Sequence, residues 1–327
     1  MLKPPKQPCA VKTIIGYISA AATYLRWRGV TASPYMPGSG GRAMHPAIAD
    51  ILNHRRKWRP QKQRKEPVTA GIFQTGYAEV QRTRKHSYSG HLDLECAIWD
   101  WTALGCHTGF RLSEFGQSKK RKKARFATVP HTRAAGEWAG SALALIESDF
   151  QFFDHKMRRI PIIHAIFAGA AEMHIRFRYN KNTNTFQTRR FRCIPRHPLC
   201  PVTRARCILQ RSRALCVPAN EPVGVFRTPG KHTYTFIEGK HVSSTLRRWC
   251  CLAYPDKNHY MRLHIDMLVT HSYRVTACVA LYTAGVKLEE IVYRLRWSSD
   301  AVEFYIRECG VTADYYTLSA VQGALAT

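Results

Sequence analysis

The chain of 327 residues is poor in acidic side chains. It has 22 Asp and Glu against 50 Lys and Arg, so its formal net charge at pH 7 is +28. A surface this basic attracts polyanions through its long-range field and through the release of their counterions. We therefore expect a nucleic acid as partner. An anionic membrane surface is the weaker alternative, because no long basic amphipathic helix is evident.

Other common features are also missing. No apolar run is long enough to span a bilayer, and the opening MLKPPKQPCAVK lacks the apolar core of a secretory signal. Glycine-rich phosphate loops of the Walker or dinucleotide type are absent, so no nucleotide cofactor is indicated. We expect a soluble, intracellular chain that works without a cofactor and does not bind a membrane.

The 11 cysteines include no CxxC pair. Only Cys193, His197 and Cys200 are closely spaced, and no fourth ligand is evident, so no metal site is predicted. We expect the cysteines to be buried thiols in a reducing compartment.

The most informative stretch runs from His271 to Arg307. His271 and Arg274 are three residues apart and would share one side of a helix. The guanidinium fork matches two phosphate oxygens, and an imidazole can share the phosphate charge or move a proton near neutral pH. Trp297 and Tyr305 follow in the segments RWSSDA and YIR, which add an indole N–H and a phenol.

Apolar spacing predicts three short helices in this stretch. The first would open at Thr270 or His271 and stop near Gly285. The second carries an apolar stripe, and the third would be capped by Ser299 or Asp300. The stripe consists of Leu288, Ile291, Val292 and Leu295.

The order HSYR, TAGV, RWSSDA and YIR resembles the catalytic end of the tyrosine recombinases, the phage-integrase family. The motif RWSSDA followed by YIR is most similar to the recombinases of eukaryotic mobile elements such as the Crypton and DIRS-like groups. The resemblance implies that Tyr305 attacks a DNA phosphodiester to form a 3′-phosphotyrosyl link, without ATP or metal. It also implies that His271, Arg274 and Trp297 hold the phosphate.

The same resemblance implies a second arginine upstream in a GxRxxE setting. The segment CHTGFRLSEFGQ supplies it as Arg111, with Glu114 as a supporting residue that orients the site. The alternative for Arg111 is an ordinary surface ion pair with Glu114.

The family also uses a lysine on a β-hairpin to protonate the leaving 5′-hydroxyl. Two β-like runs, 173–179 and 186 to about 194, flank the turn-rich NKNTNT, and Lys181 stands at its tip. The alternative is a solvated turn lysine. The run after Lys156 is interpreted as an earlier strand.

Two domains are predicted. Residues 1–85 are expected to form a helical DNA-clamping domain similar to the family's core-binding domain, N-terminally truncated because its opening resembles the middle of such a domain. Residues 83–93 would be the linker. Residues 86–327 would be the catalytic domain, mainly α with a small antiparallel sheet over about 148–195, an α+β fold. The irregular order of strands and helices argues against a parallel sheet.

Two basic runs are candidate DNA contacts, and the alternative for each is a solvated loop. The run SKKRKKARF could also be a nuclear-import signal, which would favour the nucleus if the host is a eukaryote. The candidate DNA-contacting residues are Arg55, Arg56, Lys57, Arg59, Lys119, Lys120, Arg121 and Lys122.

The expected partner is double-stranded DNA. The resemblance to the tyrosine recombinases implies a homotetramer on two DNA sites. Two other functions stay open at this point. One is a strand transferase like the type IB topoisomerases, which relaxes DNA alone. The other is a non-catalytic DNA-binding remnant of a mobile element.

Overall fold

The computed structural model describes residues 17–18, 20–24, 45–49, 65–86, 90–116, 144–178, 186–228 and 233–297. The chain divides into two compact units, Met1–Gln63 and Arg64–Thr327. In the first unit the described helical residues are 17–18, 20–24 and 46–49.

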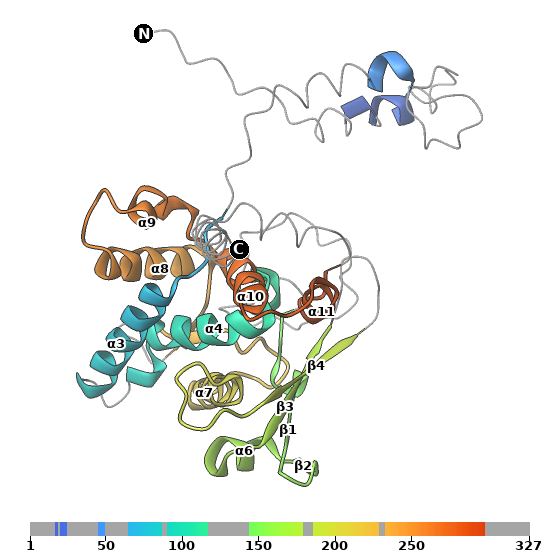
Figure 1. Ribbon diagram of the computed structural model, residues 1–327. Coiled ribbons are helices and arrows are strands. Elements are labelled where there is room, and N and C mark those ends of the chain that lie inside the picture. Colours follow the sequence, from blue (N-terminus) through green and yellow to red (C-terminus); the bar gives the residue numbers. More distant parts are fainter. Residues whose placement is uncertain are drawn as a thin grey trace, which may run out of the picture. The chain divides into compact units, whose positions relative to one another are not determined.

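The described residues of the second unit form mostly helices (Figure 1). The symbol η denotes a 3-10 helix. In chain order the helices are α3 (Ala70–His86), η1 (Gly90–Leu92), α4 (Leu94–Thr108), α5 (Leu112–Phe115), η2 (Glu147–Asp149), α6 (Ile162–Ala168), α7 (Pro201–Ala214), α8 (Gly239–Ala253), α9 (Tyr260–Leu263), η3 (Ile265–Met267), α10 (Ser272–Thr283) and α11 (Leu288–Arg294).

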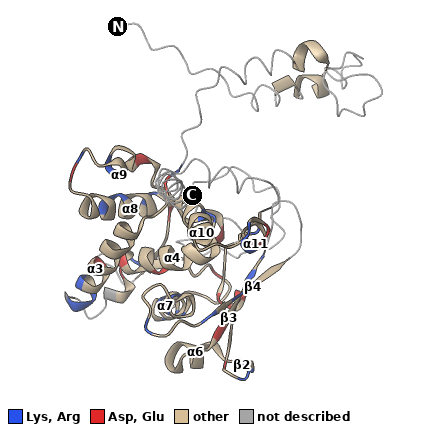
Figure 2. Cartoon of the chain, in the orientation of Figure 1, with Lys and Arg blue, Asp and Glu red and all other residues tan. Residues whose placement is uncertain are grey.

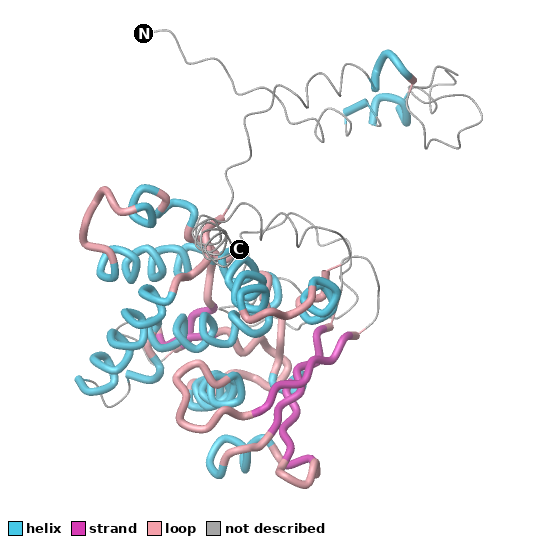
Figure 3. Tube along the Cα trace, viewed as in Figure 1, coloured by secondary structure: helices cyan, strands magenta, loops and turns pink. Residues whose placement is uncertain are grey.

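The strands form one antiparallel sheet of four strands, in the order β2-β1-β3-β4, and one two-stranded sheet of β5 and β6. They are β1 (Phe150–Phe153), β2 (Arg159–Ile160), β3 (Glu172–Phe177), β4 (Gln187–Arg192), β5 (Val225–Arg227) and β6 (Tyr234–Phe236). The four-stranded sheet lies at one side of the unit and most helices at the other (Figure 3).

Helix α4 is the centre of the core. Its residues 96–105 are all buried, because α10, α7, α3 and α8 pack around it. A helix that is covered on all sides needs apolar residues around its whole circumference, and the sequence CAIWDWTALG supplies them with two exceptions, Asp100 and Thr102.

The four-stranded sheet buries one face. Alternate side chains of β1 and β3 point inward, and the register sets Phe152 opposite Met173 and Met173 opposite Phe191. This alternation is why the hairpin of β3 and β4 was recognisable in the sequence. Its strands begin and end within one or two residues of the predicted runs.

A mainly helical fold with a small antiparallel sheet is therefore confirmed. Two details differ from expectation. Only Arg159–Ile160 of the run after Lys156 is a strand, and the next residues form helix α6, which follows Pro161 at its N-cap. A short apolar run has no period that separates strand from helix, and the fixed φ of Pro161 suits a helix start.

The two compact units divide between Gln63 and Arg64. Helix α3, whose residues precede most of the expected catalytic region, packs against α8 and α4 of the second unit and buries Ile72 and Val80 there. The expected linker at 83–93 begins inside α3. Within the described residues, no helix is both long and apolar enough to cross a membrane.

Candidate active site

The turn between α4 and α5 delivers the first candidate residue, Arg111. Helix α4 ends at Thr108, and Gly109 takes the left-handed conformation with φ +56°, its N–H donating to the carbonyl of Gly105 at 2.8 Å. A Cβ at Gly109 would lie 3.2 Å from Cδ2 of Leu295. Glycine therefore fits here on two counts, conformation and space. Arg111 then caps α5 in an extended conformation.

The carboxylate of Glu114 contacts both the backbone and the side chain of Arg111. Its Oε2 accepts the backbone N–H of Arg111 at 2.8 Å, and its Oε1 lies 3.4 Å from Nη1 of the guanidinium. The ion pair expected as the ordinary alternative is thus present. However, Glu114 is 5% exposed, so its carboxylate is not part of a surface pair. The Arg111 side chain, by contrast, is 35% exposed.

The second candidate arginine meets the same turn. Arg274 lies in the first turn of α10, and its Nη1 donates to the carbonyl of Gly109 at 3.3 Å. Its guanidinium carbon is 5.0 Å from the ring centroid of Trp297. The fold therefore gathers Arg111, Arg274 and Trp297, which the sequence supplies in three separate segments. Arg274 and Trp297 are almost covered, so Arg111 is the more open cation.

His271 occupies the N-cap position of α10, as the sequence predicted, and is partly buried. Its carbonyl accepts the N–H of Arg274 at 3.0 Å. The helix also ends where expected, with Gly285 in the left-handed conformation at φ +78°.

Several predicted site residues lie outside the described residues. These are the nucleophile candidate Tyr305, the hairpin lysine Lys181, and the candidate DNA contacts Arg55, Arg56, Lys57, Arg59, Lys119, Lys120, Arg121 and Lys122.

Arg296 is a site residue that the sequence analysis did not find. Its side chain is 1% exposed, and its Nη2 lies 2.9 Å from Oε2 of Glu114. Glu114 therefore sits between two arginines, Arg111 and Arg296. Burial holds the pKa of Arg296 below its ordinary value, and the charge of Glu114 opposes that shift.

The backbone explains why Arg296 points inward. Helix α11 ends in a Schellman motif: Arg296 N–H donates to the carbonyl of Tyr293 at 3.2 Å, and Trp297 N–H donates to that of Val292 at 2.9 Å. Arg296 is the left-handed residue of this motif, with φ +58°. Glycine usually takes that position, because a side chain there costs about 1–2 kcal/mol. No sequence signal separates this arginine from an ordinary helical one.

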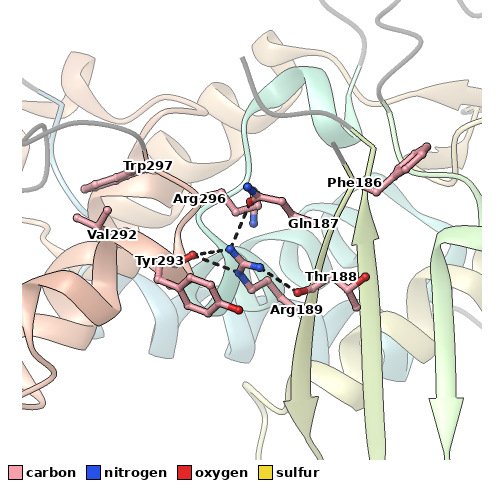
Figure 4. A pocket seen from close by; sticks show the side chains of 8 residues that line it. All are labelled: Phe186, Gln187, Thr188, Arg189, Val292, Tyr293, Arg296 and Trp297. Atoms are coloured by element: carbon pink, nitrogen blue, oxygen red, sulfur yellow. Dashed lines mark hydrogen bonds between the residues drawn. The ribbon is translucent and has the colours of Figure 1, made fainter. Parts of the chain in front are cut away.

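A second group missed in the sequence joins the hairpin to α11. The guanidinium of Arg189 on β4 donates twice to the carbonyl of Tyr293, at 3.2 and 2.7 Å, and lies 4.1 Å from the centroid of its ring. Figure 4 shows these contacts in a cavity of about 340 Å³ between the start of β4 and the end of α11. The start of β4 is thereby fixed to the end of α11, in a cavity that Trp297 also lines.

Arginines stand on β4 and α11, the two elements that border the cavity (Figure 2). Arg189 and Arg296 line it, and Arg294 on α11 donates to the carbonyl of Arg190 at 2.8 Å. Burial also holds the pKa of Arg189 below its ordinary value. Arg296 has Glu114 as its counter-ion, whereas Arg189 contacts carbonyl and amide oxygens, so Arg189 is the cation of this cavity that suits a phosphate.

The cysteine and histidine trio lies in the segment between β4 and the start of α7. Cys193 and Cys200 bring their sulfur atoms to 3.7 Å, and Cys200 accepts the N–H of Thr203 at the start of α7. Within the described part of the chain, no three His, Cys, Asp or Glu side chains form a group that could hold a metal ion.

Comparison with known proteins gives no assignment. No family model matches the chain, and no curated protein matches it either.

Proposed function

We propose that the chain is a DNA strand transferase of the tyrosine recombinase type, which cleaves and rejoins double-stranded DNA through a covalent link to Tyr305. The observation that carries the proposal is the meeting of Arg111 and Arg274 at one turn, beside Trp297. Two distant motifs, each chosen for its ability to bind phosphate, converge in space.

In the proposed reaction the phenolic oxygen of Tyr305 attacks the phosphorus and the bond to the 5′-oxygen breaks. Lys181 gives its proton to the leaving 5′-oxygen. Arg111 and Arg274 neutralise the non-bridging oxygens as negative charge develops on them. The same cations favour the phenolate form of Tyr305, whose ordinary pKa is about 10.

The remaining residues would complete the grip on the phosphate. His271 would donate a hydrogen bond or move a proton, and Trp297 would donate its indole N–H. Attack by another strand's 5′-hydroxyl on the phosphotyrosine reverses the step and exchanges DNA partners. The covalent link conserves the bond energy, so ATP is not needed.

A second candidate is a DNA-binding protein without turnover. The burial of Arg274 and Trp297, at 5% and 8% exposure, favours it. A DNA phosphate reaches Arg274 only if the groups that cover it move. While Arg274 stays buried, Arg111 would be the arginine of this pair that contacts a phosphate.

Covalent trapping tests the proposal. The full chain is incubated with nicked suicide duplexes from a randomised pool, and adducts that survive detergent are separated by electrophoresis. The expected result is an adduct in the native chain and none in Tyr305→Phe, with nearly equal DNA affinity for both. Tyr293→Phe is the matched control, because Tyr293 is 67% exposed beside the cavity and is expected to be dispensable for attack.

Three outcomes would count against this assignment. An adduct that persists in Tyr305→Phe would exclude that tyrosine as the nucleophile. Salt-sensitive DNA binding without any adduct would favour the second candidate. Relaxation of supercoiled plasmids by a monomer would instead indicate an enzyme like the type IB topoisomerases.

A further inference from the structure

We infer that Arg296 is a positioning residue for Arg111, acting through the carboxylate of Glu114. The inference rests on the proposed function, since it assigns Arg111 to a phosphate. Its basis is a set of contacts that join three elements of the fold at one buried guanidinium.

The first contacts reach the turn that carries Arg111. Arg296 donates through Nη1 to the carbonyl of Thr108 at 3.2 Å and through Nη2 to Oε2 of Glu114 at 2.9 Å. The next carbonyl, that of Gly109, accepts from Arg274. Two arginines, one in α10 and one just after α11, therefore bind consecutive carbonyls of one turn. That arrangement fixes the height and tilt of the turn relative to α10 and α11.

The second contact reaches the hairpin. The guanidinium carbon of Arg296 lies 3.4 Å from the ring centroid of Phe177, the last residue of β3. A guanidinium over an aromatic face is attracted by the ring quadrupole, and the attraction is stronger away from water. Arg296 thus ties the loop end of β3 to the turn that carries Arg111.

Burial decides between a positioning and a direct role. The Arg296 side chain is 1% exposed and has Glu114 as its ion-pair partner, so a substrate phosphate does not reach it. Arg111 is the exposed partner of the same carboxylate. A change at Arg296 must therefore act on substrate through Glu114 and Arg111.

The conformation of Arg296 argues against a purely structural role. Glycine would complete the Schellman motif without the crowding that a side chain meets at φ +58°. A strained non-glycine residue whose side chain converges on a candidate site is a recognised sign of function. The chain also offers a matched control, because Arg196 has φ +61° and is exposed in the turn after β4.

The experiment is a double-mutant cycle with Arg296→Gly, Glu114→Gln and the double variant, plus Arg196→Gly as control. Two quantities are measured in the full chain: the single-turnover rate of adduct formation on nicked duplexes, and the affinity for orthovanadate by calorimetry. Orthovanadate is a phosphate-like anion, so its binding reports the placement of Arg111 without catalysis. Thermal unfolding shows whether each variant is folded at the assay temperature. If Arg296→Gly is not folded, Arg296→Lys is used in its place.

We expect Arg296→Gly and Glu114→Gln each to lower both the adduct rate and the vanadate affinity by about tenfold. In the double variant both quantities should be no lower than in the weaker of the two single variants, because the two residues act through one contact. Arg196→Gly should match the native chain. Independent, multiplying effects, or native vanadate affinity in folded Arg296→Gly, would overturn the inference. If the native chain forms no adduct yet the cycle holds for vanadate, the proposed function fails and the positioning role stands. If the native chain neither forms adduct nor binds vanadate, both fail.

Discussion

Two carboxylates in the second unit are each held between two arginines, and they differ in what the arginines can still do. Asp100, in the middle of α4, lies between Arg204 and Arg211 of α7. Glu114, just beyond the end of α4, lies between Arg111 and Arg296. The chemistry of the two groups is the same, so their surroundings set the difference.

At Asp100 both guanidinium groups are enclosed, with side-chain exposures of 8% for Arg204 and 1% for Arg211. Their charges are taken up by the carboxylate and by the carbonyl of His91, which accepts from Arg211 at 2.9 Å. At Glu114 one guanidinium is enclosed, and the other, that of Arg111, is 35% exposed. We call each carboxylate with its two arginines a triad. The enclosed Asp100 triad joins two helices, whereas the Glu114 triad, with one exposed cation, can also hold an anion.

The largest expected effect is at the enclosed triad. Asp100→Asn keeps the side-chain shape but leaves two buried guanidinium groups without a counter-charge. We expect the free energy of unfolding to fall by about 3–5 kcal/mol, measured by urea denaturation. Glu114→Gln is the matched substitution, and we expect a smaller loss, because Arg111 can turn to solvent. Equal losses at the two positions would remove the distinction between the triads.

The open triad should respond in function more than in stability. Arg111→Ala is expected to lower the rate of covalent adduct formation by about 100- to 1,000-fold, the effect of losing one preorganised charge-stabilising donor. Its unfolding midpoint should stay close to that of the native chain. The control is Arg82→Ala, because Arg82 is likewise an exposed arginine paired three residues away, with Glu79. A normal adduct rate in folded Arg111→Ala would contradict the assignment.

The smallest effect concerns pH and the last turn of α4, between the two triads. Burial holds the pKa of His107 below its ordinary value, and its Nε2 contacts the carbonyl of Leu199 at 2.8 Å. The unfolded chain binds a proton here more readily than the folded chain. The contribution of neutral His107 to the free energy of unfolding is therefore full above about pH 6.5 and is lost as the pH falls toward the lowered pKa.

His107→Gln should flatten the stability profile between pH 7 and 5, by less than about 1.4 kcal/mol per pH unit, the limit for one proton. The measurement is urea denaturation across that range. His91 and His241 also have pKa values lowered by burial, so part of the slope should remain. An unchanged slope would show that the end of α4 opens to solvent more freely than the Asp100 triad does.

Much of the fold was predictable because its signals are local. The hairpin of β3 and β4 and the start and stop of α10 follow from periodicity, turn residues and capping within short windows. Helix α6 was missed because a short apolar run fits a strand equally well. The contact of Arg111 with Glu114 was foreseen because they are three residues apart.

By itself the sequence determined which residues could bind phosphate, and in which elements they stand. Only the tertiary structure decided that Arg274 reaches the carbonyl of Gly109, that Arg296 turns inward to Glu114, and that Asp100 closes on α7. An arginine carries the same charge on a surface, in a buried pair or at an open site. Which of the three it becomes depends on the helix end that aims it and on the partners that exclude water, and these come from distant parts of the chain.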